Sequence, residues 1–72
     1  MRRLVGNNVR RLRLAAGLSQ AALAAKMDVD RAYISGLEKG DRNPTILTLW
    51  HVAQALDVKV RAFFDERSRR SR

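Results

Sequence analysis

The chain has 72 residues, of which 46% are hydrophobic, and this is enough apolar material for one small domain. It has no cysteine, so no disulfide can stabilise it, and no apolar run reaches the ~18 residues that cross a bilayer. Fifteen Lys and Arg against seven Asp and Glu give a net charge of +8, and twelve of the fifteen are Arg. Because the planar guanidinium suits phosphate and guanine, this balance favours a nucleic-acid partner over a membrane, with a merely basic surface as the plain alternative.

The first residues are basic, but no long apolar stretch follows them, so the start does not resemble a signal peptide. Together with the lack of cysteine, this indicates a protein of the reducing cytoplasm. The chain begins with Met1 and ends in a polar tail, and we therefore expect a complete small protein.

A first helix is predicted from Val5, Val9, Leu12 and Ala16, which recur at the spacing of one helical face. Gly17 follows directly, and a glycine at this point can end the helix in a left-handed turn.

Two short helices are predicted next, separated by a three-residue turn. Ser19 is a candidate N-cap for a helix over 20–26, and Asp30 is a candidate N-cap for a helix over 31–39. Gly40 is placed to end the second of them. Two helices at this spacing indicate a helix-turn-helix.

The last third of the chain predicts two more helices. Thr45 can cap a fourth helix, whose inner face would hold Ile46, Leu49, Val52, Ala53 and Leu56. A turn at 57–58 precedes a short fifth helix over 61–65. The tail at 67–72 has no apolar residue and should be disordered, so we expect a domain over 1–66 and a basic tail. Helices joined by short loops, with no strand pattern, predict an all-α fold.

Residues 5–64 resemble the Cro/C1 (XRE) family of helix-turn-helix proteins, to which the phage repressors belong. The shared features lie in register across five elements: Gly17-Leu18-Ser19-Gln20, Leu23-Ala24, Ile34-Ser35, Leu37-Glu38-Lys39-Gly40, Arg42-Asn43-Pro44-Thr45, Ala53, Leu56 and Val58. Asp28 and Asp57 stand where the family usually has Gly, and Asp adopts the left-handed conformation at modest cost. The resemblance implies a compact five-helix, lambda-repressor-like DNA-binding domain. The segment over 30–38, with Arg42-Asn43, looks especially like the controller proteins of restriction–modification systems.

The resemblance implies that the second helix of the motif lies in the major groove and presents its N-terminal residues to base edges. The residues of that helix that would read bases are Arg31, Ala32, Tyr33, Ser35 and Gly36. Arg31 is the candidate for a bidentate contact with guanine, and a phosphate contact is its alternative. Ala32 either touches a thymine methyl or only avoids a clash. Tyr33 either contacts DNA or is a partly buried aromatic.

Other residues would hold the DNA backbone. Gln20 begins the first helix of the motif, where its side chain and backbone amide would face a phosphate. The resemblance assigns the same role, on the other side of the groove, to Arg42, Asn43 and Thr45. Such contacts position a protein without reading sequence. Arg2, Arg3 and the tail either add such contacts or are simply solvated.

The family also pairs an Arg of the first helix with a Glu late in the recognition helix. Here the resemblance assigns these positions to Arg13 and Glu38, and a phosphate contact is the alternative for Arg13.

A symmetric dimer is predicted partly from the resemblance, because one recognition helix reads only a few base pairs and a dimer addresses two half-sites. The candidate interface residues are Leu47, Trp50, Val60, Phe63 and Phe64. Of the two phenylalanines, one is expected in the core. A solitary exposed Trp50 is the alternative to an interface tryptophan.

We therefore predict a homodimeric, sequence-specific transcriptional regulator that binds double-stranded DNA at a palindromic operator, as a restriction–modification controller or an ordinary small repressor. We expect no enzyme, because no catalytic arrangement is visible, and no cofactor or metal, because His51 is the only histidine. One alternative is an antitoxin that neutralises a protein toxin and autoregulates its operon. Another is an interaction module that has lost DNA binding. RNA polymerase and a toxin stay open as further partners.

Overall fold

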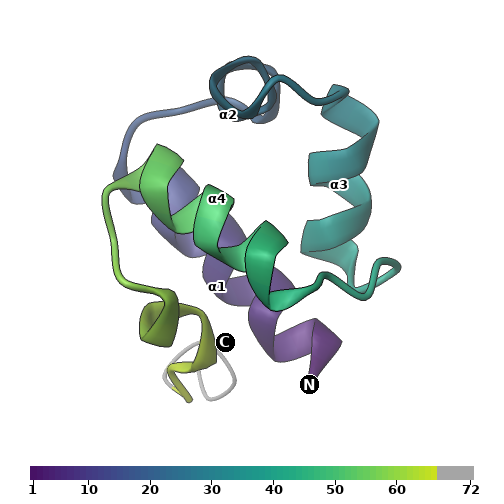
Figure 1. Cartoon of the computed structure of the whole chain (residues 1–72), viewed down its shortest axis with the longest axis vertical. Coiled ribbons are helices and arrows are strands. Elements are labelled where there is room, and N and C mark those ends of the chain that lie inside the picture. The colour runs from purple at the N-terminus through teal and green to yellow at the C-terminus, as the bar shows by residue number, and fades with distance from the viewer. Residues whose placement is uncertain (67–72) are drawn as a thin grey trace.

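The computed structural model describes residues 1–66, which form four α-helices and one short 3-10 helix. In chain order these are α1 (Arg2–Ala15), α2 (Gln20–Met27), α3 (Arg31–Lys39), α4 (Ile46–Leu56) and the 3-10 helix η1 (Val60–Phe64). Figure 1 shows α4 in front of α1 and running in nearly the same direction, with α2 above this pair, α3 to its right and η1 at the lower left. The all-α prediction is confirmed, whereas the predicted disordered tail at 67–72 lies outside the described residues.

The fifth element differs from the prediction. It is a 3-10 helix over 60–64, not an α-helix over 61–65. The amide of Asn8, on α1, explains the difference, because its Nδ2 donates to the carbonyl oxygens of Phe63 at 2.8 Å and Asp65 at 2.9 Å. These carbonyls are satisfied from outside the segment, and a continuing α-helix is not needed to pair them.

Side-chain caps begin three of the helices where the sequence predicts them. The hydroxyl of Ser19 accepts a hydrogen bond from the backbone N–H of Ala22 at the start of α2. The carboxylate of Asp30 accepts from the N–H of Ala32 in α3. Thr45 accepts in the same way at α4. Each cap satisfies one N–H that has no partner within its own helix.

Two aspartates stand in left-handed conformations that glycine usually adopts. Asp28 ends α2 with φ of 59°, and Asp57 ends α4 with φ of 57°. The short polar side chain of Asp tolerates this region better than most residues do. The departures from the family pattern at these positions therefore leave the turns intact.

The core lies between the helices and, among residues 1–66, contains eleven buried apolar side chains, from Val5 and Val9 in α1 to Phe63 in η1. Two predictions about it are wrong. Ala16 is exposed, because α1 ends at Ala15 and Ala16 begins the turn. Ile46 is 69% exposed, because it is the first residue of α4 and its side chain lies outside the stripe that faces the core.

Helices α1 and α3 approach each other at Gly6. A methyl group at this position would lie 2.5 Å from the carbonyl oxygen of Leu37 and 2.6 Å from that of Glu38. These are backbone atoms that cannot move aside independently, so only glycine allows the two helices to pack at this distance. Within residues 1–66, no helix is long and apolar enough to span a membrane.

Candidate nucleic-acid interface

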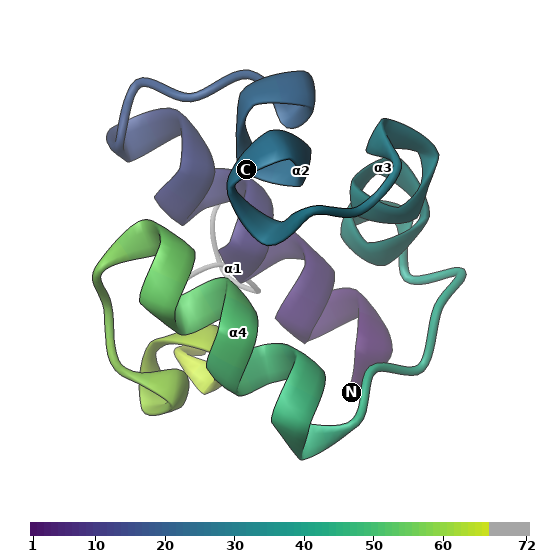
Figure 2. The same ribbon diagram turned by 45° about the horizontal axis from the view of Figure 1, so that its top comes forward.

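The second helix of the motif, α3, has an inner face fixed in the core and an outer face open to solvent. Ile34 and Leu37 are buried, at 0% and 1% exposure. Arg31 and Ala32 are exposed in the first turn of α3, and Ser35 is half-buried one turn later. Figure 2 shows α2 and α3 side by side at the edge of the molecule. The exposed side chains of Arg31 and Ala32 leave the first turn of α3 open to solvent.

The structure places Arg13 and Glu38 in a buried ion pair. The Nε of Arg13 donates to Oε2 of Glu38 at 2.6 Å, and Nη2 donates to Oε1 at 3.1 Å. The third nitrogen, Nη1, donates to the carbonyl oxygen of Leu18 at 2.8 Å, in the loop between α1 and α2. The side chains are only 8% and 4% exposed, so Arg13 is not a phosphate contact. The pair joins α1, the loop and the end of α3.

Gln20 connects this ion pair to the exposed turn of α3. Its Nε2 donates to Oε1 of Glu38 at 3.1 Å, and its Oε1 accepts a hydrogen bond from Nη1 of Arg31 at 3.1 Å. From the sequence, Gln20 was predicted only to contact a phosphate, and neither bond was predicted. No pattern in the sequence predicts these two bonds, because Glu38 and Arg31 lie 18 and 11 residues from Gln20 along the chain.

Arg42 lies against the recognition helix, in contact with two of its residues. Its guanidinium carbon is 5.3 Å from the centre of the Tyr33 ring, a cation–π contact. A methyl group on Gly36 would lie 3.2 Å from both Cγ and Nε of Arg42. Gly36 thus leaves the space in which Arg42 lies. The structure brings these residues together at one edge of α3.

The remaining predicted phosphate residues lie at the start of α4. Asn43 is exposed in the loop before the helix, and Thr45 is exposed at its N-cap. The hydroxyl of Thr45 already accepts from the N–H of Thr48 at 3.1 Å and pairs with its hydroxyl at 3.0 Å. Thr45 therefore orders the first turn of α4 as well as facing solvent.

The predicted interface residues divide into two groups. Leu47, Trp50 and Phe64 are exposed, at 63%, 48% and 37%, and Val60 is half-buried. Phe63 is wholly buried and packs in the core, so its place in the predicted interface is wrong and it is the core member of the phenylalanine pair.

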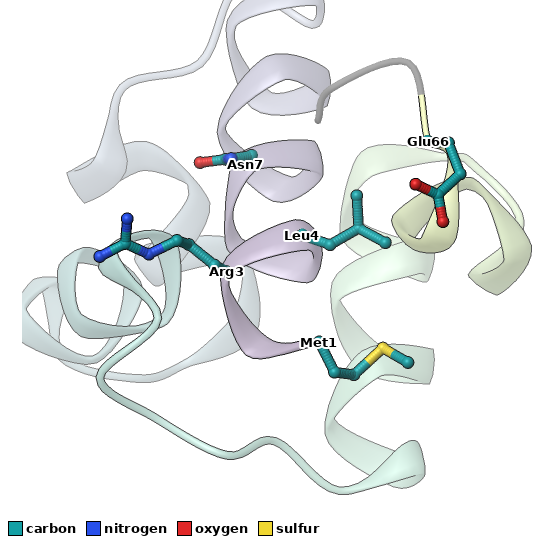
Figure 3. Close-up of a pocket in the computed structure, with 5 residues that line it drawn as sticks. All are labelled: Met1, Arg3, Leu4, Asn7 and Glu66. Carbon is teal, nitrogen blue, oxygen red and sulfur yellow. The ribbon is translucent and has the colours of Figure 1, made fainter. Parts of the chain in front are cut away.

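Ile46 joins the exposed group. It shares a hollow with Phe64 and Met1, so the uncovered apolar surface runs from α4 to the beginning of α1. We call Ile46, Leu47, Trp50 and Phe64 the α4–η1 face. Figure 3 shows a neighbouring hollow in which Met1 and Leu4 extend toward the side of Glu66, whereas Arg3 extends to the opposite side of α1.

Asn8 is a buried polar residue that was not predicted from the sequence. Its Oδ1 accepts from Nη2 of Arg11 at 3.0 Å, while its Nδ2 holds the carbonyls of η1. A signal was present, because Asn8 lies three residues after Val5 and one before Val9, on the apolar face of α1. A polar residue at such a position needs buried partners.

The comparisons with known proteins agree with this geometry. The model of the family described as Helix-turn-helix matches residues 9–63. The chain is 50% identical over 58 residues to the uncharacterized HTH-type transcriptional regulator y4dJ of Sinorhizobium fredii, covering 81% of this chain and 75% of the relative. It is 36% identical over 66 residues to the control protein C.BamHI of Bacillus amyloliquefaciens, covering 90% of this chain and 82% of the relative.

Two solved structures are similar over most of their lengths. The restriction-modification controller protein C.AhdI from Aeromonas hydrophila has a TM-score of 0.82 at 40% identity, covering 86% of this chain and 94% of that one. The controller protein C.Esp1396I, solved as a tetramer in complex with its natural 35 base-pair operator, has a TM-score of 0.77 at 39% identity, covering 86% and 82%. The chain therefore belongs to the Cro/C1 (XRE) helix-turn-helix family of DNA-binding transcriptional regulators.

Proposed function

We propose that the chain binds double-stranded DNA at an inverted-repeat operator as a homodimer and thereby regulates transcription. The observation that carries this proposal is the exposed first turn of α3, where Arg31 projects from a helix whose inner face is buried and whose end is held by the Arg13–Glu38 pair. The net charge of +8 supplies the attraction to phosphates that such binding requires.

In this proposal, Arg31 donates two parallel hydrogen bonds to O6 and N7 of a guanine in the major groove. The exposed methyl of Ala32 suits a thymine methyl, and the hydroxyl of Ser35 can donate to or accept from a base edge. Tyr33 and Gly36, which Arg42 partly covers, would lie at the margin of the contact.

The residues that would bind phosphate stand on both sides of the recognition helix. Gln20 lies at the N-terminus of α2, where unpaired backbone N–H groups favour an anion. Asn43 and Thr45 lie at the N-terminus of α4, and Arg42 lies in the loop between α3 and α4. Together they would set the position of α3 in the groove without reading the sequence.

A dimer follows from the size of the recognition helix. With nine residues, α3 is about 14 Å long and can follow only about four base pairs. A second copy related by a two-fold axis would place another α3 about 34 Å away, one turn along the DNA. We propose that the α4–η1 face, with Val60 at its margin, forms this contact, because exposed aromatic and aliphatic groups gain most from mutual burial.

Among regulators of this family, a restriction–modification controller is the more specific proposal. It is supported by the similarity to C.BamHI and to the solved controller C.AhdI, each aligned over most of its length. An endonuclease or methyltransferase gene beside the gene for this chain would agree with it. A toxin gene in that place would favour an antitoxin instead.

Selection of bound sequences from a random duplex library tests the proposal. We expect an inverted repeat whose half-sites lie about one helical turn apart. Arg31→Ala should then cost about 1–3 kcal/mol of specific affinity and relax the preference at one base pair, whereas Arg42→Ala should weaken all duplexes more evenly. Recovery of no motif, with binding that only falls steeply with salt, would contradict sequence-specific regulation.

A further inference from the structure

Three basic residues lie where the beginning of α1 approaches the end of α3. A methyl group on Gly40 would lie 3.4 Å from Cα of Arg3 and 3.7 Å from the carbonyl carbon of Arg2, so the two helix ends are close together. Lys39, the last residue of α3, directly precedes Gly40. Arg2, Arg3 and Lys39 are all exposed, and we call these three residues the α1–α3 basic patch.

No carboxylate in the described part of the chain neutralises this patch. Two arginines farther along α1 are paired, Arg11 with Asp65 and Arg13 with Glu38. The first turn of α1 contains no acidic residue. Asp41, in the loop that follows α3, forms no ion pair within residues 1–66, and neither do the three residues of the patch. The patch therefore presents three positive charges to solvent.

The α1–α3 basic patch stands beside a residue already proposed to hold DNA. Arg2 lines the same hollow as Asn43, in the loop before α4. Figure 3 shows Arg3 extending away from Met1 and Leu4, to the other side of α1. With nine residues, α3 is about 14 Å long, whereas the major groove is only about 8.5 Å deep. If the first turn of α3 meets base edges, its last turn lies farther from the floor of the groove, near the level of the phosphates.

We propose that the α1–α3 basic patch binds the sugar–phosphate backbone of the operator, as a site additional to the four phosphate-binding residues proposed above. This inference rests on the proposed function, since it takes α3 as the helix in the groove. Guanidinium and ammonium groups donate charge-assisted hydrogen bonds to phosphate oxygens, and each phosphate that they neutralise releases counterions. Such a contact raises the affinity for every duplex without reading its sequence. The alternative is a solvated patch that only adds to the net charge.

The salt dependence of binding separates a phosphate contact from an effect of net charge. Wild type, Arg3→Gln, Arg3→Lys and Arg10→Gln are each titrated with the selected operator and with an unrelated duplex over a series of salt concentrations. Arg10→Gln is the matched control, because it removes the same charge from an exposed position of the same helix, about two turns from Arg3. Arg3→Lys keeps the charge at the patch. Thermal unfolding of each chain is followed in parallel.

We expect Arg3→Gln to reduce the slope of log affinity against log salt by about 1.8, because each phosphate contact contributes about 0.9 and a dimer contains two copies. Both duplexes should lose affinity to a similar extent, so the ratio of the two affinities should not change. Arg3→Lys should keep the wild-type slope, and Arg10→Gln should change it by less than half as much as Arg3→Gln. The thermal midpoints should all lie within about 3 °C of wild type, because Arg3 has no hydrogen-bond partner among residues 1–66.

Two results would overturn the phosphate site. Equal changes of slope in Arg3→Gln and Arg10→Gln would leave only an effect of net charge, and an unchanged slope in Arg3→Gln would exclude a contact. Either result leaves the proposed function standing, because the wild-type chain still selects an operator. If the wild-type chain selects no operator, the proposed function itself fails, which is a different result from a change of slope.

Discussion

Two surfaces proposed for binding, the outer side of α2–α3 and the α4–η1 face, are built from different contacts. At the outer side of α2–α3, the exposed side chains have partners within the chain: Arg31 bonds to Gln20, and Arg42 lies over Tyr33. At the α4–η1 face, large apolar groups such as Trp50 and Leu47 stand in solvent. A polar partner can be met by prearranged donors, whereas apolar groups gain free energy only when they are covered.

Trp50→Ala should have the largest effect, and it should fall on association. An interface tryptophan contributes about 2 kcal/mol or more, and a symmetric dimer loses two, so the dissociation constant should rise roughly 1000-fold. Sedimentation over a range of protein concentrations measures this. Trp50→Phe, which keeps an aromatic ring, should retain much of the association. Unchanged dimerisation in Trp50→Ala would mean that this tryptophan is a solitary exposed residue.

Glu38→Ala should damage the other surface from within. It leaves Arg13 buried without its partner and releases Gln20, and we expect a loss of roughly 3 kcal/mol in the free energy of unfolding. Urea denaturation at fixed protein concentration measures the change. An apolar pair, Arg13→Met with Glu38→Met, should recover part of the stability but not the hydrogen bond to Gln20. If the single and double variants are equally unstable, the loss of stability comes from altered packing at this site and not from the unpaired charge of Arg13.

Asn8→Ala tests the contact that fixes η1. It leaves two carbonyl oxygens without their donor, and a loss of about 2 kcal/mol is expected in unfolding free energy. Asn7→Ala is the matched control, because Asn7 is the exposed neighbour on the same helix. The control should stay within about 0.5 kcal/mol of wild type. If the two substitutions cost the same, the Asn8 hydrogen bonds do not hold the segment.

Tyr33→Leu should have the smallest effect. A cation–π contact at the surface contributes about 0.5–1 kcal/mol, and leucine keeps an apolar group where the half-buried Tyr33 packs against the core, so unfolding should change little. The informative measurement is coupling with Arg42→Gln. If the contact stabilises the fold, the double variant should lose less free energy of unfolding than the sum of the losses in the two single variants. Strict additivity would show that Arg42 and Tyr33 act independently.

Local patterns in the sequence predicted the helices and their ends well. Caps at Ser19 and Asp30 depend on neighbouring residues alone, so a single sequence contains the information. The left-handed turns at Asp28 and Asp57 were expected from the resemblance, because the family usually has Gly at these positions. Ile46 was misplaced in the core for a related reason. The spacing of apolar residues does not show where the helix begins, and Ile46, the first residue of α4, is exposed.

Contacts between distant segments were predicted only where a family pattern supplied them. The Arg13–Glu38 pair came from the resemblance, and the structure contains it. The resemblance did not predict the hydrogen bonds of Gln20 or the close approach of Gly6 to the end of α3, because both depend on how two helices cross. Phe63 and Phe64 could be separated only when the direction of η1 was known.

Helix α1 carries both proposed surfaces. It contacts α3 through Gly6 and Arg13, and it contacts η1 through Asn8. The distance between the recognition helix and the α4–η1 face therefore depends on this one continuous helix. In a symmetric pair, this distance determines how far apart two half-sites can lie. One extra base pair between them would move the second groove by 3.4 Å and turn it by about 35°. Because α1 is a single helix without an internal hinge, the dimer cannot adjust to an added base pair between the half-sites. The spacing of the half-sites should therefore be conserved more strictly than any single base of the operator.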